Sequence, residues 1–311
     1  MKVQIYISND FCKDYMPFMI YRNIIHNILS ETLGIDISCI YNLCDISGDK
    51  ETIVILNMYD LTLYEEKENV LYTIERTNAR FVIINTEHWK NWGVYDLLKK
   101  IQDEGYQCTI FEYNVINYNN IISEFPHVNM LFLPLVYNDH LENYYTSNIT
   151  QKISWNNKDI DVLFYGGINE RRKTILDSLK NKYNVHIISS HHGATNSDLC
   201  KYIERSKIVI NVLYYDYNVI FDYYRNTLLL SNGVLLVSEM PLTMDTKLEP
   251  WIKDIETNMQ FVKYNELKER VEKLLSSNKD EIQELIKTQC SNFKKYDMKD
   301  ILIPYWKKYF Q

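Results

Sequence analysis

The sequence predicts an α/β protein of two domains, each built on a parallel sheet with helices on both faces. The chain has 311 residues, enough for two domains of roughly 150 residues. Short apolar runs alternate with amphipathic helical stretches, which is the pattern of a doubly wound parallel sheet. The alternation stops once, in the polar stretch Tyr137–Lys158, and then begins again. Such a stretch, rich in Asn, Ser and Thr, has the composition of a linker.

In the first half, six apolar runs are predicted to be strands. Two of them, Thr52–Asn57 and Phe81–Asn85, are apolar on both faces, as expected of strands covered from both sides. The other four predicted strands are Val3–Ser8, Ile35–Tyr41, Gln107–Glu112 and Asn129–Leu133. Helices are predicted at Met16–Thr32, Glu65–Thr77, Tyr95–Glu104 and Asn117–Glu124.

The second half repeats the pattern. Its predicted strands are Asp161–Tyr165, Val185–Ser189, Ile208–Leu213, Val234–Ser238 and Gln260–Lys263. Its predicted helices are Glu170–Lys182, Ser197–Arg205 and Phe221–Leu230, followed by mostly helical sequence after the last strand. Asn232-Gly233 is expected to end the third of these helices as a glycine cap.

Composition excludes several functional classes. The formal net charge of −7 argues against a general nucleic-acid binder, which needs a basic face for phosphates. The start, MKVQIYISNDF, does not have the pattern of a signal peptide, and no apolar run approaches ~20 residues. Six scattered cysteines without CxxC spacing indicate neither a zinc site nor a disulfide framework. We therefore expect a cytoplasmic protein without a transmembrane segment.

The first candidate site follows the strand Asp161–Tyr165. Gly166-Gly167 ends the strand and leads into a helix whose first turn carries Arg171 and Arg172. Glycines allow the backbone to approach an anion, and the N-terminus of a helix favours negative charge. An arginine there can add a charge-assisted contact to a pyrophosphate. The alternative is that the glycine pair only makes a tight turn.

The second candidate site follows the strand Ile208–Leu213. Tyr214 and Tyr215 come next, and the following helix places Asp222 and Arg225 three residues apart on one face. Asp222 in the first turn could accept bonds from two ribose hydroxyls, and Arg225 could reach a phosphate. The alternative is an ordinary surface ion pair.

The positions of these residues favour a binding site. Each group lies at the carboxyl end of a predicted parallel strand, as does Ser238-Glu239, and ligands of open α/β sheets bind at that edge. The order D-V-L-F-Y-G-x-x-N-x-R-R, Gly193, S-K-I-x-x-N, acidic-x-x-Arg and V-S-E resembles the donor-binding half of GT-B glycosyltransferases. It is most similar to enzymes that build microbial and large-virus surface polysaccharides and glycans. The resemblance covers Asp161–Glu239, with weaker matches at Asn85-Thr86-Glu87-His88 and Leu133-Pro134-Leu135.

The resemblance implies a GT-B architecture of two Rossmann-like domains whose parallel sheets face a central cleft. Residues 1–140 would be the acceptor-side domain, 141–158 a linker, 159–290 the nucleotide-sugar-binding domain, and 291–311 a helix that crosses back to the first domain. The crossing would explain the aromatic stretch Tyr296–Phe310, for which a peripheral membrane contact remains the alternative, although Pro304 interrupts it.

The resemblance also assigns roles. Gly166, Gly167, Asn169 and Arg172 would surround the donor phosphates, with Arg225 on the diphosphate. Tyr214 and Tyr215 would line the sugar or base pocket, Asp222 would hold the ribose, and Glu239 would belong to the same donor site. Two departures are that the family usually has Glu where this chain has Asp222, and often has His where it has Leu213.

No metal or cofactor is expected, because members of this fold usually stabilise the departing diphosphate with basic side chains and helix N-termini. The D-x-D pair Asp159 and Asp161 precedes its strand, so both carboxylates are predicted at the wrong end of the sheet for catalysis. His191-His192 lacks a carboxylate at suitable spacing and is expected to line the donor cleft or face water.

In the first domain the candidate general base is Glu87 or His88, just beyond the strand Phe81–Asn85. The alternatives are a helix-terminal carboxylate and a packed or solvated imidazole. Asp10 and His26 are further acceptor-side possibilities by residue type alone.

The sequence thus predicts a glycosyltransferase that moves a sugar from a UDP- or GDP-sugar to a hydroxyl on a glycan, glycolipid or protein-linked acceptor, with both substrates in the cleft. The alternatives are a sugar-nucleotide epimerase or hydrolase on the same fold, and a catalytically silent nucleotide-sugar-binding subunit. A dinucleotide-dependent oxidoreductase is disfavoured, because neither half opens with GxGxxG.

Overall fold

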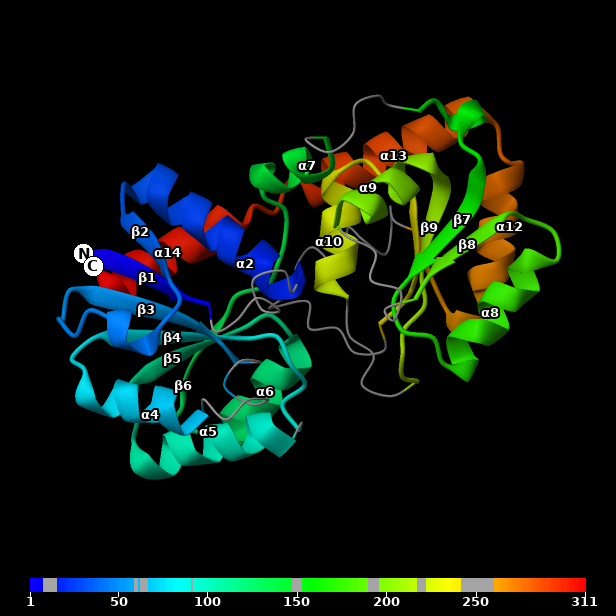
Figure 1. Ribbon diagram of the computed structural model, residues 1–311. Coiled ribbons are helices and arrows are strands. Elements are labelled where there is room, and N and C mark those ends of the chain that lie inside the picture. Colours follow the sequence, from blue (N-terminus) through cyan, green and yellow to red (C-terminus); the bar gives the residue numbers. More distant parts are fainter. Residues whose placement is uncertain are drawn as a thin grey trace. The chain divides into compact units, whose positions relative to one another are not determined.

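A computed structural model describes the chain in nine segments. These are residues 1–7, 16–58, 61, 67–90, 92–146, 153–189, 196–216, 222–241 and 260–311. The chain divides into two compact units. Unit 1 contains Met1–Leu135 and Met298–Gln311, and unit 2 contains Val136–Asp297. Each unit is an α/β structure with its own parallel sheet (Figure 1).

Unit 1 is built on a six-stranded, all-parallel sheet in the order β2-β1-β3-β4-β5-β6. The strands are β1 (Lys2–Tyr6), β2 (Asp36–Ile40), β3 (Thr52–Asn57), β4 (Arg80–Asn85), β5 (Cys108–Glu112) and β6 (Asn129–Phe132). All six predicted strands are present, with ends that differ from the prediction by at most two residues. Strands β3 and β5 are buried along their whole length, which accounts for their apolar sequences.

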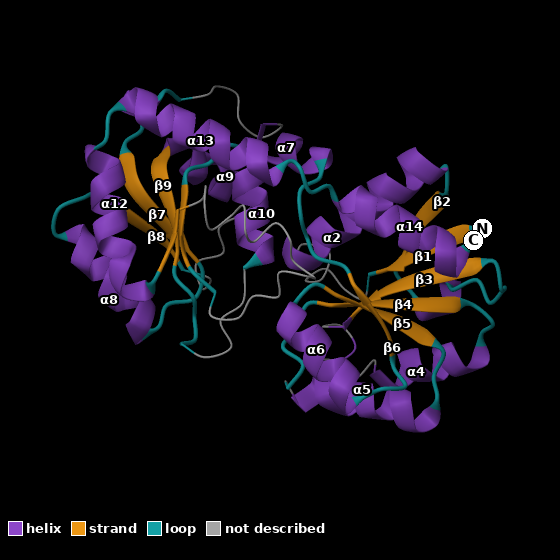
Figure 2. Ribbon diagram, turned by 180° about the vertical axis from the view of Figure 1, so that it is seen from behind, coloured by secondary structure: helices purple, strands orange, loops and turns teal. Residues whose placement is uncertain are grey.

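Helices cover both faces of this sheet, as Figure 2 shows. Helices α4 (Lys67–Arg76), α5 (Trp92–Glu104) and α6 (Val115–Glu124) lie on one face, and α2 (Met16–Asn27) and α14 (Met298–Phe310) on the other. Helix α2 continues directly into one π-helical turn, Ile28–Thr32. The core on the α4–α5 side is apolar; its members include Leu56, Phe81, Leu97 and Ile110.

Helix α14 completes unit 1 from the far end of the chain. Its buried residues Met298, Leu302, Trp306 and Phe310 recur at every fourth position, which places them along one face of the helix. Pro304 does not interrupt the helix, contrary to the prediction from the sequence. Pro304 is exposed, so the carbonyl that its missing N–H leaves unpaired can face water.

Unit 2 is built on a five-stranded parallel sheet in the order β8-β7-β9-β10-β11. The strands are β7 (Ile160–Tyr165), β8 (Val185–Ile188), β9 (Ser206–Asn211), β10 (Leu236–Glu239) and β11 (Gln260–Val262). Helices α8 (Glu170–Lys180) and α12 (Leu267–Ser276) cover one face, and α9 (Asn196–Arg205) and α10 (Tyr223–Ser231) the other. The predicted glycine cap is present: Gly233 follows α10 with φ +70°.

The boundary between the units differs from the predicted one. The predicted linker 141–158 contains structure: its described residues belong to unit 2, and helix α7 (Asp139–Thr146) includes its beginning. Tertiary contacts hold this polar helix. Leu141 is buried, its carbonyl accepts from Asn232 Nδ2 at 2.6 Å, and Glu142 pairs with Lys294 of helix α13 (Lys279–Phe293). Amino-acid composition alone does not reveal such long-range contacts.

Both units share one strand order. If the strands of each unit are numbered in chain order, each sheet reads second, first, third, fourth, fifth, with a sixth strand in unit 1. In such a sheet the connections leave in opposite directions from the first and third strands, and the crevice at their carboxyl ends is where ligands bind. In unit 2 this point lies between β7 and β9. No described helix is both long and apolar enough to cross a membrane.

Candidate active site

The turn after β7 is shaped by Gly166. Its φ is +129°, a conformation that residues with a Cβ rarely adopt. Its N–H donates to Ile188 O of β8 at 2.9 Å, so this N–H is already used within the fold. A Cβ atom at residue 166 would lie 2.9 Å from Arg225 Nη2 and 3.7 Å from Arg172 Nη1. Gly166 therefore allows two guanidinium groups to approach the backbone at the end of β7.

Arg172 is a buried cation. Its Nε donates to Val212 O at 2.8 Å and its Nη1 to Gly167 O at 2.7 Å. Burial and then the charge of Arg225 lower the pKa of Arg172 to about 10, which leaves it charged at neutral pH. Within the described residues no carboxylate lies at ion-pair distance from this side chain. The lowered pKa indicates that an anion bound here would be stabilised.

Arg225 approaches from α10. Its Nη1 donates to the buried Asn211 Oδ1 and lies 3.1 Å from Asp222 Oδ2. Asp222 is the N-cap of the helix, and its Oδ1 accepts from Arg225 N at 3.2 Å. The Arg225 guanidinium also lies over the Tyr165 ring, 4.8 Å from its centroid. One aspartate thus both caps the helix and holds the arginine in place.

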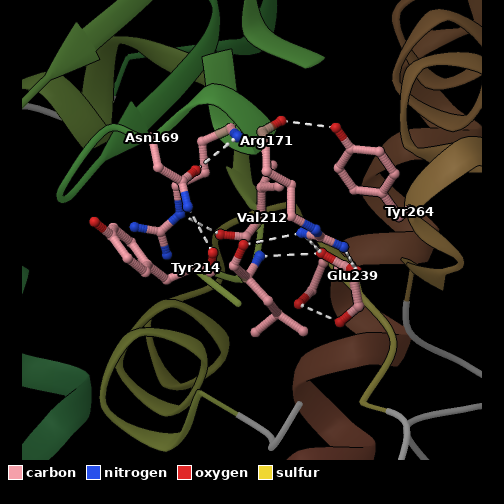
Figure 3. Close-up of polar contacts among 9 residues, drawn as sticks. Asn169, Arg171, Val212, Tyr214, Glu239 and Tyr264 are labelled. Carbon is pink, nitrogen blue, oxygen red and sulfur yellow. Dashed lines mark hydrogen bonds and ion pairs between the residues drawn. The ribbon is translucent and has the colours of Figure 1, made fainter. Parts of the chain in front are cut away.

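Arg171 turns toward β10 instead of toward Arg172. Its guanidinium makes a two-pronged ion pair with Glu239 and donates from Nη1 to Leu213 O at 2.9 Å. The Tyr264 ring stacks on it at 4.0 Å, and Tyr264 Oη donates to Arg171 O at 2.7 Å (Figure 3). Although burial opposes the charge, Glu239 raises the pKa of Arg171 above its ordinary value. This pair joins the ends of β9 and β10 to the start of α8.

Asn169 and the two tyrosines form the outer part of the site. Asn169 is the N-cap of α8, and its Nδ2 donates to Tyr214 O at 2.6 Å (Figure 3). Tyr214 and Tyr215 are 41% and 55% exposed, with ring centroids 4.9 Å apart in an edge-to-face arrangement. The Tyr214 ring also lies 5.0 Å from Arg172 Cζ. An exposed aromatic beside a cation is suited to stack on a sugar or base.

The structure therefore brings most of the predicted donor-site residues together. Gly166, Arg172 and Arg225 meet directly, and Asp222 joins them through Arg225. Two of the predicted donor-binding residues already have partners within the fold. Asn169 caps helix α8, and both carboxylate oxygens of Glu239 bind Arg171.

Two residues of this site, the buried Asn211 and Tyr264, are not among those predicted from the sequence. Asn211 ends β9 inside the motif S-K-I-x-x-N, so its position at a strand end was the available signal. Gly193 and His191-His192 lie outside the described residues, as does Asp10.

The D-x-D pair lies where the sequence predicts. Asp159 and Asp161 flank the first residue of β7, at the amino end of the sheet. Asp159 pairs with Arg205 and Asp161 with Lys207. Among the described residues no group of three or more His, Cys, Asp or Glu side chains is arranged to hold a metal ion.

In unit 1 the candidate bases follow β4. Glu87 is half-buried, and its N–H donates to Asn85 Oδ1 at 3.0 Å. His88 Nδ1 accepts from Lys90 N at 3.2 Å, so the neutral ring carries its proton on Nε2. Burial and then Lys90 lower the pKa of His88 below its usual value. In this tautomer Nε2 is a hydrogen-bond donor, which leaves Glu87 as the better candidate for a general base.

The other predicted acceptor-side features are separate from this segment in the chain. His26 on α2 is half-buried, with Nδ1 3.2 Å from Asn27 Oδ1, and lines a hollow of about 450 Å³ with Arg22 and Tyr41. In the Leu133-Pro134-Leu135 motif both leucines are buried, and Leu133 O accepts from the hydroxyl of Tyr21. This motif therefore packs the end of the sheet.

Glu112 was missed. It is the last residue of β5, is completely buried, and is bonded to Asn85, Asn114 and Asn117. Burial raises its pKa to about 8, against the opposing effect of those bonds. Strongly shifted pKa values of this kind concentrate at functional sites and in the buried polar networks that support them. In the sequence it reads only as the end of an apolar strand.

Comparison with known proteins identifies the fold. The chain is similar to a glycosyltransferase from Rickettsia africae (TM-score 0.54, 9% identity, covering 99% of this chain and 97% of that one). It is also similar to a trehalose-6-phosphate synthase (0.52, 9%, covering 94% and 79%) and to the N-terminal domain of a Candida albicans trehalose-6-phosphate phosphatase (0.53, 8%, covering 98% and 95%). The predicted GT-B class, with two Rossmann-like domains and parallel sheets, is confirmed.

Sequence comparison adds one relative. The uncharacterised protein R358 of Acanthamoeba polyphaga mimivirus is 27% identical over 223 residues, which cover 71% of each chain. No model of a protein family matches the chain.

Proposed function

We propose that this protein is a glycosyltransferase that uses a nucleotide-diphosphate sugar, with UDP- and GDP-sugars as the first candidates, and transfers the sugar to a hydroxyl group during glycan synthesis. The proposal is supported by the GT-B fold. The single observation that carries it is the meeting of Arg172, Arg225 and the Gly166 backbone at the point in unit 2 where the strand order reverses.

The chemistry of sugar transfer gives this cluster its role. When the glycosidic bond of the donor breaks, negative charge develops on the departing nucleoside diphosphate. Preorganised cations stabilise that charge most strongly where water is excluded. Arg172 is 6% exposed and Arg225 is held by Asn211 and Asp222, so neither guanidinium has to reorganise when the ligand binds. We assign the diphosphate to these two arginines, without a metal ion.

The remaining donor contacts are assigned by exposure. Tyr214 and Tyr215 are both exposed, and the Tyr214 ring lies beside Arg172; we assign both tyrosines to the sugar or the base. Asp222 keeps a partly exposed carboxylate, which we assign to the ribose hydroxyls. For Glu239 we propose an indirect role, because Arg171 already holds its carboxylate.

Unit 1 is proposed to supply the acceptor side, and Glu87 the general base. Transfer to a hydroxyl requires a group that accepts its proton. Glu87 follows a strand end at the carboxyl edge of the sheet. Its backbone is fixed by two hydrogen bonds: its N–H donates to Asn85 Oδ1, and its carbonyl accepts from Asn117 Nδ2. The acceptor would be a glycan, a glycolipid or a protein-linked sugar, and the chain would act in the cytoplasm.

A panel of UDP-, GDP-, TDP-, ADP- and CMP-linked sugars tests the donor by thermal shift. A ligand that binds only the folded state stabilises it, by about 2.7 kcal/mol when the ligand concentration is 100 times Kd. This stabilisation appears as a higher melting temperature. The sugar that stabilises most is then incubated with and without mixed hydroxyl acceptors, and release of the nucleoside diphosphate is followed. Release that requires an acceptor is the expected result.

Other outcomes point to the alternatives. Release of the nucleotide without any acceptor would favour the epimerase or hydrolase, and binding without release would favour the silent binding subunit. Failure of every nucleotide sugar to stabilise the protein would contradict the proposal.

A further inference from the structure

A buried hydrogen-bond network lies at the carboxyl ends of β4 and β5 in unit 1. Its centre is Glu112, which is completely buried. Glu112 Oε2 accepts from Asn85 Nδ2 at 2.5 Å and from Asn117 Nδ2 at 3.3 Å. Glu112 Oε1 accepts from Asn114 N at 2.8 Å. Together with the backbone N–H of Tyr113, these groups surround the carboxyl group with hydrogen-bond donors.

Both amides on Glu112 also hold the segment that follows β4. Asn85 turns its NH2 toward the acid, and its Oδ1 accepts from Glu87 N at 3.0 Å. Asn117 divides its NH2 between the acid and Glu87 O at 2.8 Å, and its Oδ1 accepts from Trp89 N at 3.2 Å. An amide whose nitrogen faces an acceptor must present its oxygen on the other side. Glu112 thus sets the orientation of both amides.

We propose that Glu112 is the positioning residue for the Glu87–Trp89 segment: it orients the Asn85 and Asn117 side chains, and they fix the backbone on which Glu87 and His88 stand. Its effect on catalysis rests on the proposed function of this segment. Its effect on the backbone does not. A buried network of this kind keeps a unique geometry only when every member is satisfied.

Substitution of Glu112 by Gln separates this role from packing. Gln has nearly the same shape, but one of its two terminal atoms becomes an NH2 group, which cannot accept a hydrogen bond. Both oxygens of Glu112 can accept, even when one of them carries a proton. Placed at Oε2, that group would face the NH2 groups of Asn85 and Asn117. Placed at Oε1, it would face the N–H of Asn114, the N-cap of α6, and so displace the start of the helix on which Asn117 stands. If the side-chain amide of Asn85 or Asn117 rotates so that its oxygen accepts from the new NH2 group, the first conflict is relieved. The rotated amide then no longer offers its oxygen to Glu87 N–H or to Trp89 N–H, respectively.

The experiment measures two properties of Glu112→Gln: amide hydrogen exchange at Glu87 and Trp89, and kcat and KM for sugar transfer. We expect exchange at Glu87, at Trp89 or at both to become about tenfold faster, and kcat to fall at least about tenfold with KM for the donor unchanged. Thr109→Val is the matched control. Thr109 is buried in the same strand, and its bond from Asn129 Nδ2 at 2.7 Å does not touch the network. This control should lose stability and keep wild-type exchange at Glu87 and Trp89.

Asn117→Leu provides a second test of similar volume, which applies even if Glu112→Gln fails to fold. Trp89 N–H loses its acceptor, whereas Glu87 N–H keeps Asn85, so exchange should accelerate at Trp89 and stay unchanged at Glu87. Wild-type exchange at both amides in Glu112→Gln, or wild-type exchange at Trp89 in Asn117→Leu, would overturn the inference.

The two proposals can fail separately. If the wild-type protein transfers no sugar, the proposed function fails and the exchange data still decide whether Glu112 positions the segment. If exchange accelerates in an active variant whose kcat is unchanged, the catalytic half of the inference is overturned.

Discussion

The backbone of Gly166 lies against the guanidinium group of Arg225, so close that a Cβ atom at residue 166 would stand 2.9 Å from Arg225 Nη2. The two residues are brought together by the ends of two elements, strand β7 and helix α10. Asn211 and Asp222 hold Arg225 from its other side. Any side chain larger than glycine must therefore displace the cation that we assign to the diphosphate.

Gly166→Ala is expected to weaken binding of UDP or GDP about tenfold or more, and to lower the free energy of unfolding by about 1–3 kcal/mol. Two effects add, because φ at residue 166 is +129° and the new methyl group meets Arg225. Calorimetric titration and urea denaturation measure them. Gly233→Ala is the control: it strains a φ of +70° in the same unit, but no atom lies within 4 Å of its Cβ. It should lose stability and keep its nucleotide affinity, and equal loss of affinity in both variants would contradict the assignment.

Arg225→Lys should weaken binding of the same nucleotide about tenfold at low salt. Lysine keeps the charge, but it cannot contact Asn211 and a phosphate through the flat fork of a guanidinium. Arg205→Lys, which changes the ion pair with Asp159 at the opposite end of β7, is the control and should bind as the wild type does. Titration of both variants measures the difference, and unchanged affinity in Arg225→Lys would exclude that side chain from the site.

Glu239→Gln should lower the free energy of unfolding by about 1–3 kcal/mol. The pair that it breaks is largely buried, with Glu239 at 6% and Arg171 at 19% side-chain exposure, and Leu213 N–H also loses a charged acceptor. Asp161→Asn breaks a more exposed pair with Lys207 and should cost less than about 1 kcal/mol. Urea denaturation compares the two, and equal losses would show that the Arg171–Glu239 pair contributes no more than a surface ion pair.

Stability should depend on pH through Glu112. Its pKa is about 8 in the folded chain and 4.5 without the protein environment, so between these values the folded state holds a proton that the unfolded state has released. The contribution of Glu112 to the free energy of unfolding is therefore largest below about pH 4.5, and it falls as the pH rises toward 8. The loss between pH 5 and pH 8 is on the order of 3 kcal/mol.

Glu112→Gln isolates that contribution. Urea denaturation measures the unfolding free energy of wild type and variant from pH 5 to pH 8. The difference between the two should change with pH as described for Glu112, because every other titrating group is common to both. A difference that stays constant from pH 5 to pH 8 would mean that Glu112 is ionised in the folded protein.

The fold could be predicted largely from local sequence. Runs such as TIVILN in β3 are apolar on both faces, which is typical of strands that helices cover from both sides. Helix α7 could not, because its stability comes from Leu141, Asn232 and Lys294, which lie far apart in the chain. The same distinction holds in the site. Gly166 and Arg225 follow strand ends and were found by that rule, whereas Glu112 depends on partners from β4 and α6.

The return of helix α14 to unit 1 has a consequence for biosynthesis. Residues 298–311 leave the ribosome after all of unit 2, so unit 2 can fold while the sheet of unit 1 still lacks the helix that brings Trp306 and Phe310 into its core. Phe111, which Tyr305 contacts edge-on at 5.9 Å, lacks this partner until helix α14 has been made. Unit 1 is begun before unit 2 and completed after it, and a nascent chain stalled before residue 298 would leave exposed to chaperones the part of the sheet that α14 covers.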